Sequence, residues 1–233
     1  MDALGQLRSL AGGLVVSCQA REGNPLHGPV FMAAMAQAAM LGGAVGIRAD
    51  GVEDISAIAA AVGSDVPIMG IFKVKQPDGS LFITPTAESA RKVIDAGAKL
   101  EALDGTRRDR PGGESLRQVV EAIHAAGGMA LADCGTIEHA RYSLECGVDA
   151  IGSTMSGYTP DSVKTDGPDF SLIEAMAKLN PAPVFAEGRV WTREDARMAL
   201  DLGASFVVVG TAITNPTAIT ERFVAAMRGT SGE

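Results

Sequence analysis

LGASFVVVG, residues 202–210, joins the end of an expected helix to an apolar run that has the length of a buried strand. Glycine suits such a helix end because it adopts positive φ angles at little cost. The same order of residues recurs in three other segments, GGAVGIR (42–48), AGAKLEALD (96–104) and CGVDAIGST (146–154). The glycines concerned are spaced by 54, 50 and 56 residues: Gly43, Gly97, Gly147 and Gly203. The spacing indicates a repeated structural unit.

Four more apolar runs, each introduced by Gly or Pro, lie around and between these segments: LVVSCQ (14–19), VPIMGIFK (66–73), GMALAD (128–133) and PVFAEG (183–188). The stretches that separate the eight expected strands include helical patterns such as TREDARMALDLG (192–203), where Thr192 is placed to cap the helix. Eight strand-helix units with strands apolar on both faces predict a (β/α)8 TIM barrel. The alternative is an open doubly wound sheet, but neither GxGxxG nor a P-loop signature is present.

The chain is expected to form a single catalytic domain over residues 1–233, with the helix pattern DALGQLRSLAGG (2–13) closing the bottom of the barrel. The net charge of −8 and the absence of a Lys/Arg run argue against nucleic-acid binding. No apolar stretch reaches the ~20 residues that span a bilayer, so no membrane association is expected. The three cysteines lack CxxC spacing, and we expect a soluble cytoplasmic protein.

Polar residues stand where nearly all of the expected strands end. In a TIM barrel the chemistry lies at the carboxyl ends of the strands, so these residues are the candidates for an active site. In chain order they are Gln19, Arg48, Lys73, Asp104, Asp133, Ser153, Thr154, Glu187 and Gly210. The following loops add Arg107, Arg110 and Arg189, and cations gathered at one rim would suit an anionic small substrate.

Lys73 and Glu187 are the predicted catalytic pair. Lys73 could simply pair with a carboxylate such as Asp104 or Asp133, and Glu187 with Arg48 or Arg189. The functional alternative is an amine and a carboxylate that face one central pocket and act as acid and base, an effect worth ~10²–10⁴ in rate.

Segments after strands seven and eight predict a phosphate site, because barrels often bind phosphate there through backbone N–H groups. The contributors are Gly188, Gly210 and Thr211, although glycine at such turns also has a purely structural role. The longest irregular stretch, residues 153–169, is predicted to be a lid over the pocket, with Tyr158 as a polar contact. Arg189 is predicted to be a further substrate contact. The three histidines have no metal-ligand spacing, so no metal site is expected.

Nine segments in order resemble the bacterial N-acetylmannosamine-6-phosphate 2-epimerases of sialic acid and amino-sugar breakdown. The resemblance covers almost everything from Gly13 to Met227, and the segments that carry it are VSCQAREGNPLH, GGAVGIRADGV, PIMGIFK, LFITPT, ALDGTRRDRPGGE, LADCGT, STMSGYT, VFAEGR and VVVGTAIT. The resemblance implies a (β/α)8 barrel without a metal or redox cofactor that inverts C2 of N-acetylmannosamine 6-phosphate to give N-acetylglucosamine 6-phosphate. It further implies that Lys73 and Glu187 are catalytic and that Gln19, Arg48 and Asp133 contact the substrate.

The chain departs from the family pattern after TAIT, where Asn215 stands in place of the usual Arg at the phosphate end of the site. The strength of phosphate binding is therefore open. Two other functions are also considered, a Schiff-base lysine aldolase or lyase acting on a sugar phosphate and a non-catalytic sugar-phosphate-binding barrel. A homodimer is expected from the family, and ITERFVAAMRG (219–229) could bury its apolar face against a partner subunit.

Overall fold

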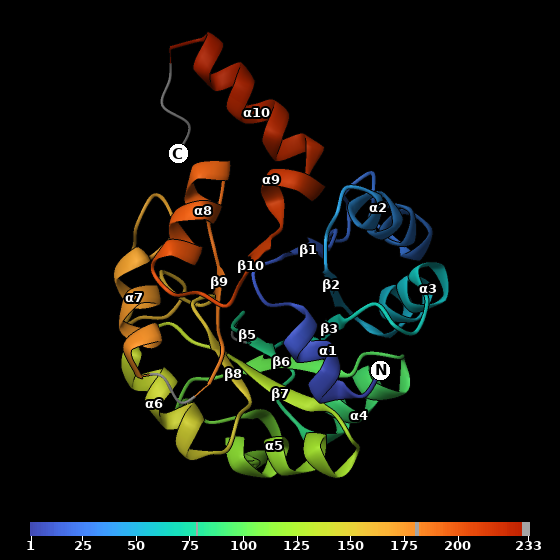
Figure 1. Cartoon of the computed structure of the whole chain (residues 1–233), viewed down its shortest axis with the longest axis vertical. Helices are drawn as coiled ribbons and strands as arrows, with labels where there is room; N and C mark the ends of the chain where they lie inside the picture. The colour runs from blue at the N-terminus through green and yellow to red at the C-terminus, as the bar shows by residue number, and fades with distance from the viewer. Residues whose placement is uncertain (78, 180–181, 230–233) are drawn as a thin grey trace.

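The computed structural model describes residues 1–77, 79–179 and 182–229 and has a closed parallel barrel at its centre (Figure 1). The strands of the barrel follow one another around it in the order β1-β10-β9-β8-β7-β6-β3-β2. Their bounds are β1 Leu14–Cys18, β2 Gly46–Asp50, β3 Ile68–Ile71, β6 Leu100–Asp104, β7 Met129–Asp133, β8 Ala150–Gly152, β9 Val184–Glu187 and β10 Phe206–Val209. The predicted (β/α)8 fold is confirmed, and the open sheet is not formed.

Helices alternate with these strands and form an outer layer around the barrel (Figure 1). Their bounds are α2 Pro29–Leu41, α3 Val52–Val62, α4 Ala87–Asp95, α5 Leu116–Ala125, α6 Ile137–Glu145, α7 Phe170–Leu179, α8 Arg193–Asp201, α9 Thr211–Thr214 and α10 Pro216–Met227, with a short 3-10 helix at Pro111–Gly113. Local sequence fixes several starts. Thr86, Ser115 and Thr192 each form a capping box with the residue three positions on.

The bottom of the barrel is closed by α1 (Ala3–Ser9), as predicted. Leu7 and the following Leu10 belong to the same buried cluster as Phe185 and Phe206, whose rings stack inside the barrel with centroids 5.5 Å apart. The strands therefore enclose a packed apolar interior at this end of the barrel.

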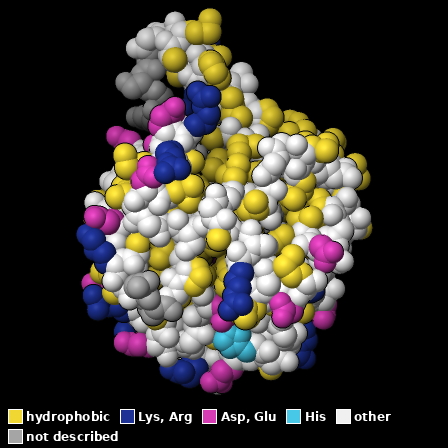
Figure 2. All heavy atoms as spheres, viewed as in Figure 1, with side chains coloured by type: hydrophobic (Ala, Val, Ile, Leu, Met, Phe, Trp, Pro, Cys, Tyr) yellow, Lys and Arg dark blue, Asp and Glu magenta, His cyan; other side chains and the backbone are white. Residues whose placement is uncertain are grey.

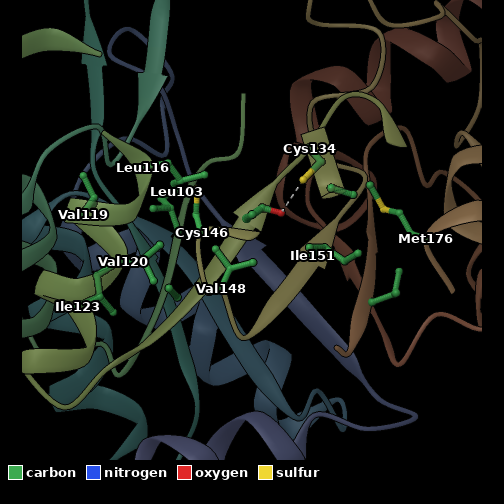
Figure 3. Close-up of a cluster of buried hydrophobic side chains, with 14 of the residues drawn as sticks. Leu103, Leu116, Val119, Val120, Ile123, Cys134, Cys146, Val148, Ile151 and Met176 are labelled. Atoms are coloured by element: carbon green, nitrogen blue, oxygen red, sulfur yellow. Dashed lines mark hydrogen bonds between the residues drawn. The ribbon is translucent and has the colours of Figure 1, made fainter. Parts of the chain in front are cut away.

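A second buried cluster fills the space between the barrel and its helices (Figure 3). Helix α5 contributes Leu116, Val119, Val120 and Ile123, which pack with Leu103, Cys134, Cys146, Val148, Ile151 and Met176. Because the strands of the barrel are covered by apolar atoms on both faces, charged residues at their ends are held on a rigid frame.

A two-stranded antiparallel hairpin, which the sequence analysis did not anticipate, follows β3. It pairs β4 (Lys73–Lys75) with β5 (Leu81–Ile83). The run 66–73 was expected to be one strand ending at Lys73. Instead β3 ends at Ile71, and Lys73 is the first residue of the hairpin.

The last helix, α10, projects from the barrel near α9, and none of its described residues is buried (Figure 1). Phe223 and Met227 on it are 68% and 87% exposed. In the described part of the chain, no helix has both the length and the apolarity needed to cross a membrane.

Candidate active site

A buried arginine joins two carboxylates that stand at the carboxyl ends of β7 and β9. Arg48, from the middle of β2, donates from Nη1 to Asp133 Oδ1 (2.9 Å) and from Nη2 to Asp133 Oδ2 (2.7 Å). Its Nη1 also donates to Glu187 Oε2 at 2.6 Å. Arg48 and Asp133 are 1% and 0% exposed, and Glu187 is 14% exposed. The structure thus brings three predicted site residues from β2, β7 and β9 into one contact group.

Glu187 is the carboxylate in this group that can exchange a proton near neutral pH. Burial raises its pKa to about 7, and the nearby Asp133 carboxylate adds to the rise, while Arg48, Thr154 and Lys73 act in the opposite direction. The guanidinium of Arg48 compensates Glu187 only partly because Asp133 takes both of its Nη atoms. Burial alone would lower the pKa of Arg48, but the two carboxylates raise it by more than burial lowers it, so Arg48 stays charged.

The oxygens of Glu187 differ in their contacts. Oε2 accepts from Arg48 and, at 3.3 Å, from the Thr154 hydroxyl, whereas Oε1 has no hydrogen bond within the described residues. The main chain of Glu187 is fixed by Ser153, whose hydroxyl donates to the Glu187 carbonyl and accepts from its N–H. One oxygen is therefore anchored and the other is available for proton transfer.

Lys73 lies in the same region, and its charge lowers the pKa of Glu187. Its Nζ donates to Gln19 Oε1 and lies 3.3 Å from Asp50 Oδ2. Lys73 therefore pairs with neither Asp104 nor Asp133, the carboxylates considered from the sequence. Gln19 is oriented in turn by donating from Nε2 to Ser17 Oγ at 2.8 Å.

Asp50 is a site residue that the sequence analysis missed. Its Oδ1 accepts from the backbone N–H of Lys73 at 3.1 Å, while Oδ2 faces the ammonium group of the same residue. The apolar run 42–48 was read as ending at Arg48, but β2 continues to Asp50. The signal that could have found it is the strand alternation, which places Arg48 and Asp50 on one face of β2.

The predicted phosphate residues follow two adjacent strands, β9 and β10. Gly188 has φ of 109°, a conformation that favours glycine, and Gly210 lies so close to Ser17 that an added Cβ would be 3.3 Å from the Ser17 Cβ. Thr211 begins the short helix α9. Asn215 caps α10 by accepting from the Ala218 N–H.

Arg189 and Tyr158, the other predicted substrate contacts, are engaged with each other. The Arg189 guanidinium lies 5.6 Å from the centre of the Tyr158 ring and donates to three oxygens of the loop 153–169. Tyr158 itself is 70% exposed. Their contacts with a substrate stay predictions.

The other rim arginines are also bound by the protein. Arg107 lies over the Tyr142 ring at 4.4 Å, and the buried Arg110 donates to the backbone carbonyls of Asp104 and Thr106. They therefore stabilise the segment after β6. Among the described residues, no cluster of three or more His, Cys, Asp or Glu side chains could hold a metal ion.

A closed (β/α)8 barrel with a buried arginine-carboxylate group and a lysine at the carboxyl end of its strands defines an enzyme of the TIM-barrel class. Residues 32–229 match the model of the family described as "Putative N-acetylmannosamine-6-phosphate epimerase". The chain belongs to this family of isomerases.

Similar proteins cover nearly the whole chain. A curated protein of Cutibacterium acnes, named "Putative N-acetylmannosamine-6-phosphate 2-epimerase", is 49% identical over 225 residues, which are 95% of this chain and 96% of that protein. The solved structure of the N-acetylmannosamine-6-phosphate 2-epimerase from Clostridium perfringens has a TM-score of 0.91 and 43% identity, covering 94% and 95% of the two chains. A thiamine phosphate pyrophosphorylase from Pyrococcus furiosus, at 17% identity, 92% and 93% coverage and a TM-score of 0.63, shares the fold alone.

Proposed function

We propose that the protein interconverts N-acetylmannosamine 6-phosphate and N-acetylglucosamine 6-phosphate by inverting C2, in amino-sugar and sialic acid breakdown. The family membership supports the substrate. The observation that carries the mechanism is Glu187, a carboxyl with a pKa of about 7 that lies within electrostatic reach of Lys73. An acid or base of this strength is suited to proton transfer at neutral pH.

In the proposed reaction the sugar is in its open form, so that the C2 hydrogen lies beside the C1 aldehyde and is acidic. Lys73, as the free amine, takes the C2 proton, and the electron pair moves into a C1–C2 double bond with the charge on the C1 oxygen. Glu187, as the carboxylic acid, gives its proton to the other face of C2, which inverts the centre. The reverse reaction exchanges the two roles, so the pair holds one proton in either direction.

The neighbouring residues have distinct roles in this proposal. Gln19 contacts Lys73 and has a second Nε2 hydrogen with which to donate to the C1 oxygen as charge develops. Arg48 and Asp133 fix Glu187 Oε2 and leave Oε1 for the proton. Gly188, Gly210 and Thr211 are proposed to bind the phosphate, and Asn215 makes the phosphate requirement a matter for direct measurement.

Proton NMR of the reaction in deuterated water tests the mechanism. We expect deuterium to enter C2 of both sugars, and we expect Lys73→Met and Glu187→Gln to lower the rate at least ~10²-fold. Lys178→Met and Glu174→Gln, which alter an exposed ion pair on α7, are the matched controls and should leave the rate unchanged. Comparison of phosphorylated and unphosphorylated N-acetylmannosamine measures the contribution of the phosphate.

Two results would point to another function. Trapping of a sugar on Lys73 by borohydride would indicate imine chemistry and an aldolase or lyase. Unchanged turnover in both Lys73→Met and Glu187→Gln would indicate that the pair is not catalytic.

We also propose that the chain works as one catalytic domain and as a homodimer. Pairing of β1 with β10 supports a single domain because it joins the two ends of the chain within one barrel. A homodimer is supported by exposed apolar side chains on two helices, Phe223 and Met227 on α10 and Val30 and Leu41 on α2, whose segment 29–41 has no charged residue. Hydrophobic atoms gather over α10 and beside α2 on the face shown in Figure 2.

Sedimentation of the purified protein tests the homodimer. We expect twice the mass of the chain, and we expect Phe223→Glu with Met227→Glu to give a monomer, because two buried carboxylates would oppose association. A monomeric parent protein at micromolar concentration would contradict this proposal. Cytoplasmic localisation stays a prediction.

A further inference from the structure

Arg189 is bound to the loop 153–169 by all three of its guanidinium nitrogens. Nε donates to the Gly167 carbonyl at 2.8 Å, Nη1 to the Ser156 carbonyl at 2.7 Å and Nη2 to Thr165 Oγ1 at 2.9 Å. The three partners lie at the beginning and near the end of the loop. One planar group therefore holds the start of the loop to its end, in addition to the hydrogen bond from Ser156 Oγ to Asp169 Oδ2 at 2.7 Å.

The chain is shaped to allow this contact. Arg189 has φ of 54°, one of two non-glycine residues with positive φ among the described residues, and it follows Gly188 with φ of 109°. A Cβ added at Gly157 would be 2.9 Å from Arg189 Nη1, so glycine at 157 leaves the space that the guanidinium occupies. A non-glycine residue held at positive φ costs free energy, which the three hydrogen bonds offset.

The same loop begins with the two residues that fix Glu187. Ser153 binds the main chain of Glu187, and Thr154 donates to its Oε2. Arg189, two residues after Glu187, binds the loop from Ser156 onward. The start of the loop thus contacts Glu187 at the end of β9, and the Arg189 guanidinium binds the same loop further along.

We propose that Arg189 is a positioning residue that acts through the loop, holding Thr154 and Ser153 against Glu187, and that it does not bind the substrate phosphate. The role rests on the proposed epimerase function. The guanidinium binds three oxygens of the protein, so an anion would have to compete with them. If Arg189 were not engaged in this way, its cation could bind the substrate phosphate in place of the family's usual arginine, where this chain has Asn215.

Steady-state kinetics distinguish the two roles of Arg189. If it positions the loop, Arg189→Met lowers kcat by about 10- to 100-fold and changes KM for the phosphorylated sugar less than about threefold, since small displacements of a catalytic group cost rate and not phosphate binding. Thr165→Val, which removes the Nη2 partner together with the hydrogen bond from Thr165 Oγ1 to the Gly167 carbonyl, lowers kcat by a smaller factor in the same direction. Arg197→Met, which removes an exposed arginine on α8, is the matched control and changes neither constant.

Amide hydrogen exchange measures the loop directly and does not depend on activity. We expect exchange over residues 153–169 to rise at least tenfold in Arg189→Met and to be unchanged in Arg197→Met. If Arg189→Met does not fold, Arg189→Lys and Thr165→Val serve in its place, because Lys keeps the charge but loses the three-pronged contact. An inactive parent enzyme would refute the proposed function, while the exchange comparison would still decide whether Arg189 holds the loop.

The inference is overturned by either of two results. One is unchanged exchange in the loop when Arg189 is replaced. The other is evidence that Arg189 is a phosphate ligand. Such evidence would be a rise of more than about tenfold in KM for the phosphorylated sugar with kcat retained, or loss of the preference for the phosphorylated over the unphosphorylated sugar.

Discussion

Arg48 and Asp133 form a two-pronged ion pair, with N–O distances of 2.9 and 2.7 Å, in which both side chains are almost wholly buried. They come from β2 and β7, which are separated in the barrel by β3 and β6. The pair therefore crosses the end of the barrel and places a positive charge under Glu187. Burial raises the pKa of Glu187 to about 7, and the Arg48 guanidinium, which it shares with Asp133, offsets this rise only in part.

Replacing Arg48 should be costly for both stability and activity. Arg48→Met leaves two buried carboxylates without their cation, and we expect the free energy of unfolding to fall by about 3–5 kcal/mol. The double variant Arg48→Met with Asp133→Leu should recover part of that loss without recovering activity. Denaturant unfolding and the NMR assay measure the two effects. Equal stability of the parent and Arg48→Met would contradict this account.

The raised pKa of Glu187 predicts the pH dependence of the reaction. In the proposed reaction Lys73 and Glu187 share one proton. Protonation of Glu187 below pH about 7 gives the pair a second proton, and neither group is then able to accept the C2 proton. We expect kcat/KM to fall tenfold per pH unit below about 7, equally in both directions of the reaction. Because the Thr154 hydrogen bond lowers the pKa of Glu187, Thr154→Val should move this limb to higher pH. A limb near the ordinary carboxyl value of 4.5 would refute the assignment.

The fold could be predicted because its signal is local and repeated. Each glycine-terminated helix followed by an apolar run marks one strand, and the pattern is the same for Gly43 and Gly203. The hairpin was missed because β4 and β5 have three residues each and pair only with one another. Such short strands carry too little periodicity to be distinguished from a loop.

The site was predictable in its members and not in its contacts. Lys73, Arg48 and Glu187 each stand near a strand end, but their partners are distant in sequence. Arg48 binds residues 85 and 139 positions away, and Asp50 reaches Lys73 across 23 positions. Which carboxylate meets which cation depends on strand register around the closed barrel, and nothing local in the sequence specifies it.

Asp50 offers a test of the electrostatic contribution to Lys73. Asp50→Asn keeps an oxygen that can accept from the Lys73 N–H but removes the charge 3.3 Å from Nζ. Because both side chains are partly exposed, the pair is worth about 1 kcal/mol, and we expect kcat to fall about fivefold. Asp201→Asn, which removes an exposed carboxylate from Arg197, is the control. A loss of a thousandfold would mean that Asp50 itself transfers a proton.

Glu101 should limit the stability of the enzyme at neutral and alkaline pH. Strand alternation puts it on the helix-facing side of β6, because Leu100 and Ala102 belong to the interior cluster. It is 0% exposed, neither carboxyl oxygen has a hydrogen bond within the described residues, and burial raises its pKa to about 9.

The folded chain binds this proton more tightly than the unfolded chain, so ionisation of Glu101 costs no stability below about pH 4.5 and progressively more as the pH rises to about 9. At pH 7 the cost corresponds to about 3 kcal/mol. We therefore expect Glu101→Met to raise the free energy of unfolding at pH 8 by a few kcal/mol and to have little effect at pH 4.5. Glu121→Met, an exposed change on α5, should give no such gain, and a gain for Glu101→Met that is the same at both pH values would show that packing, and not the buried carboxyl, is responsible.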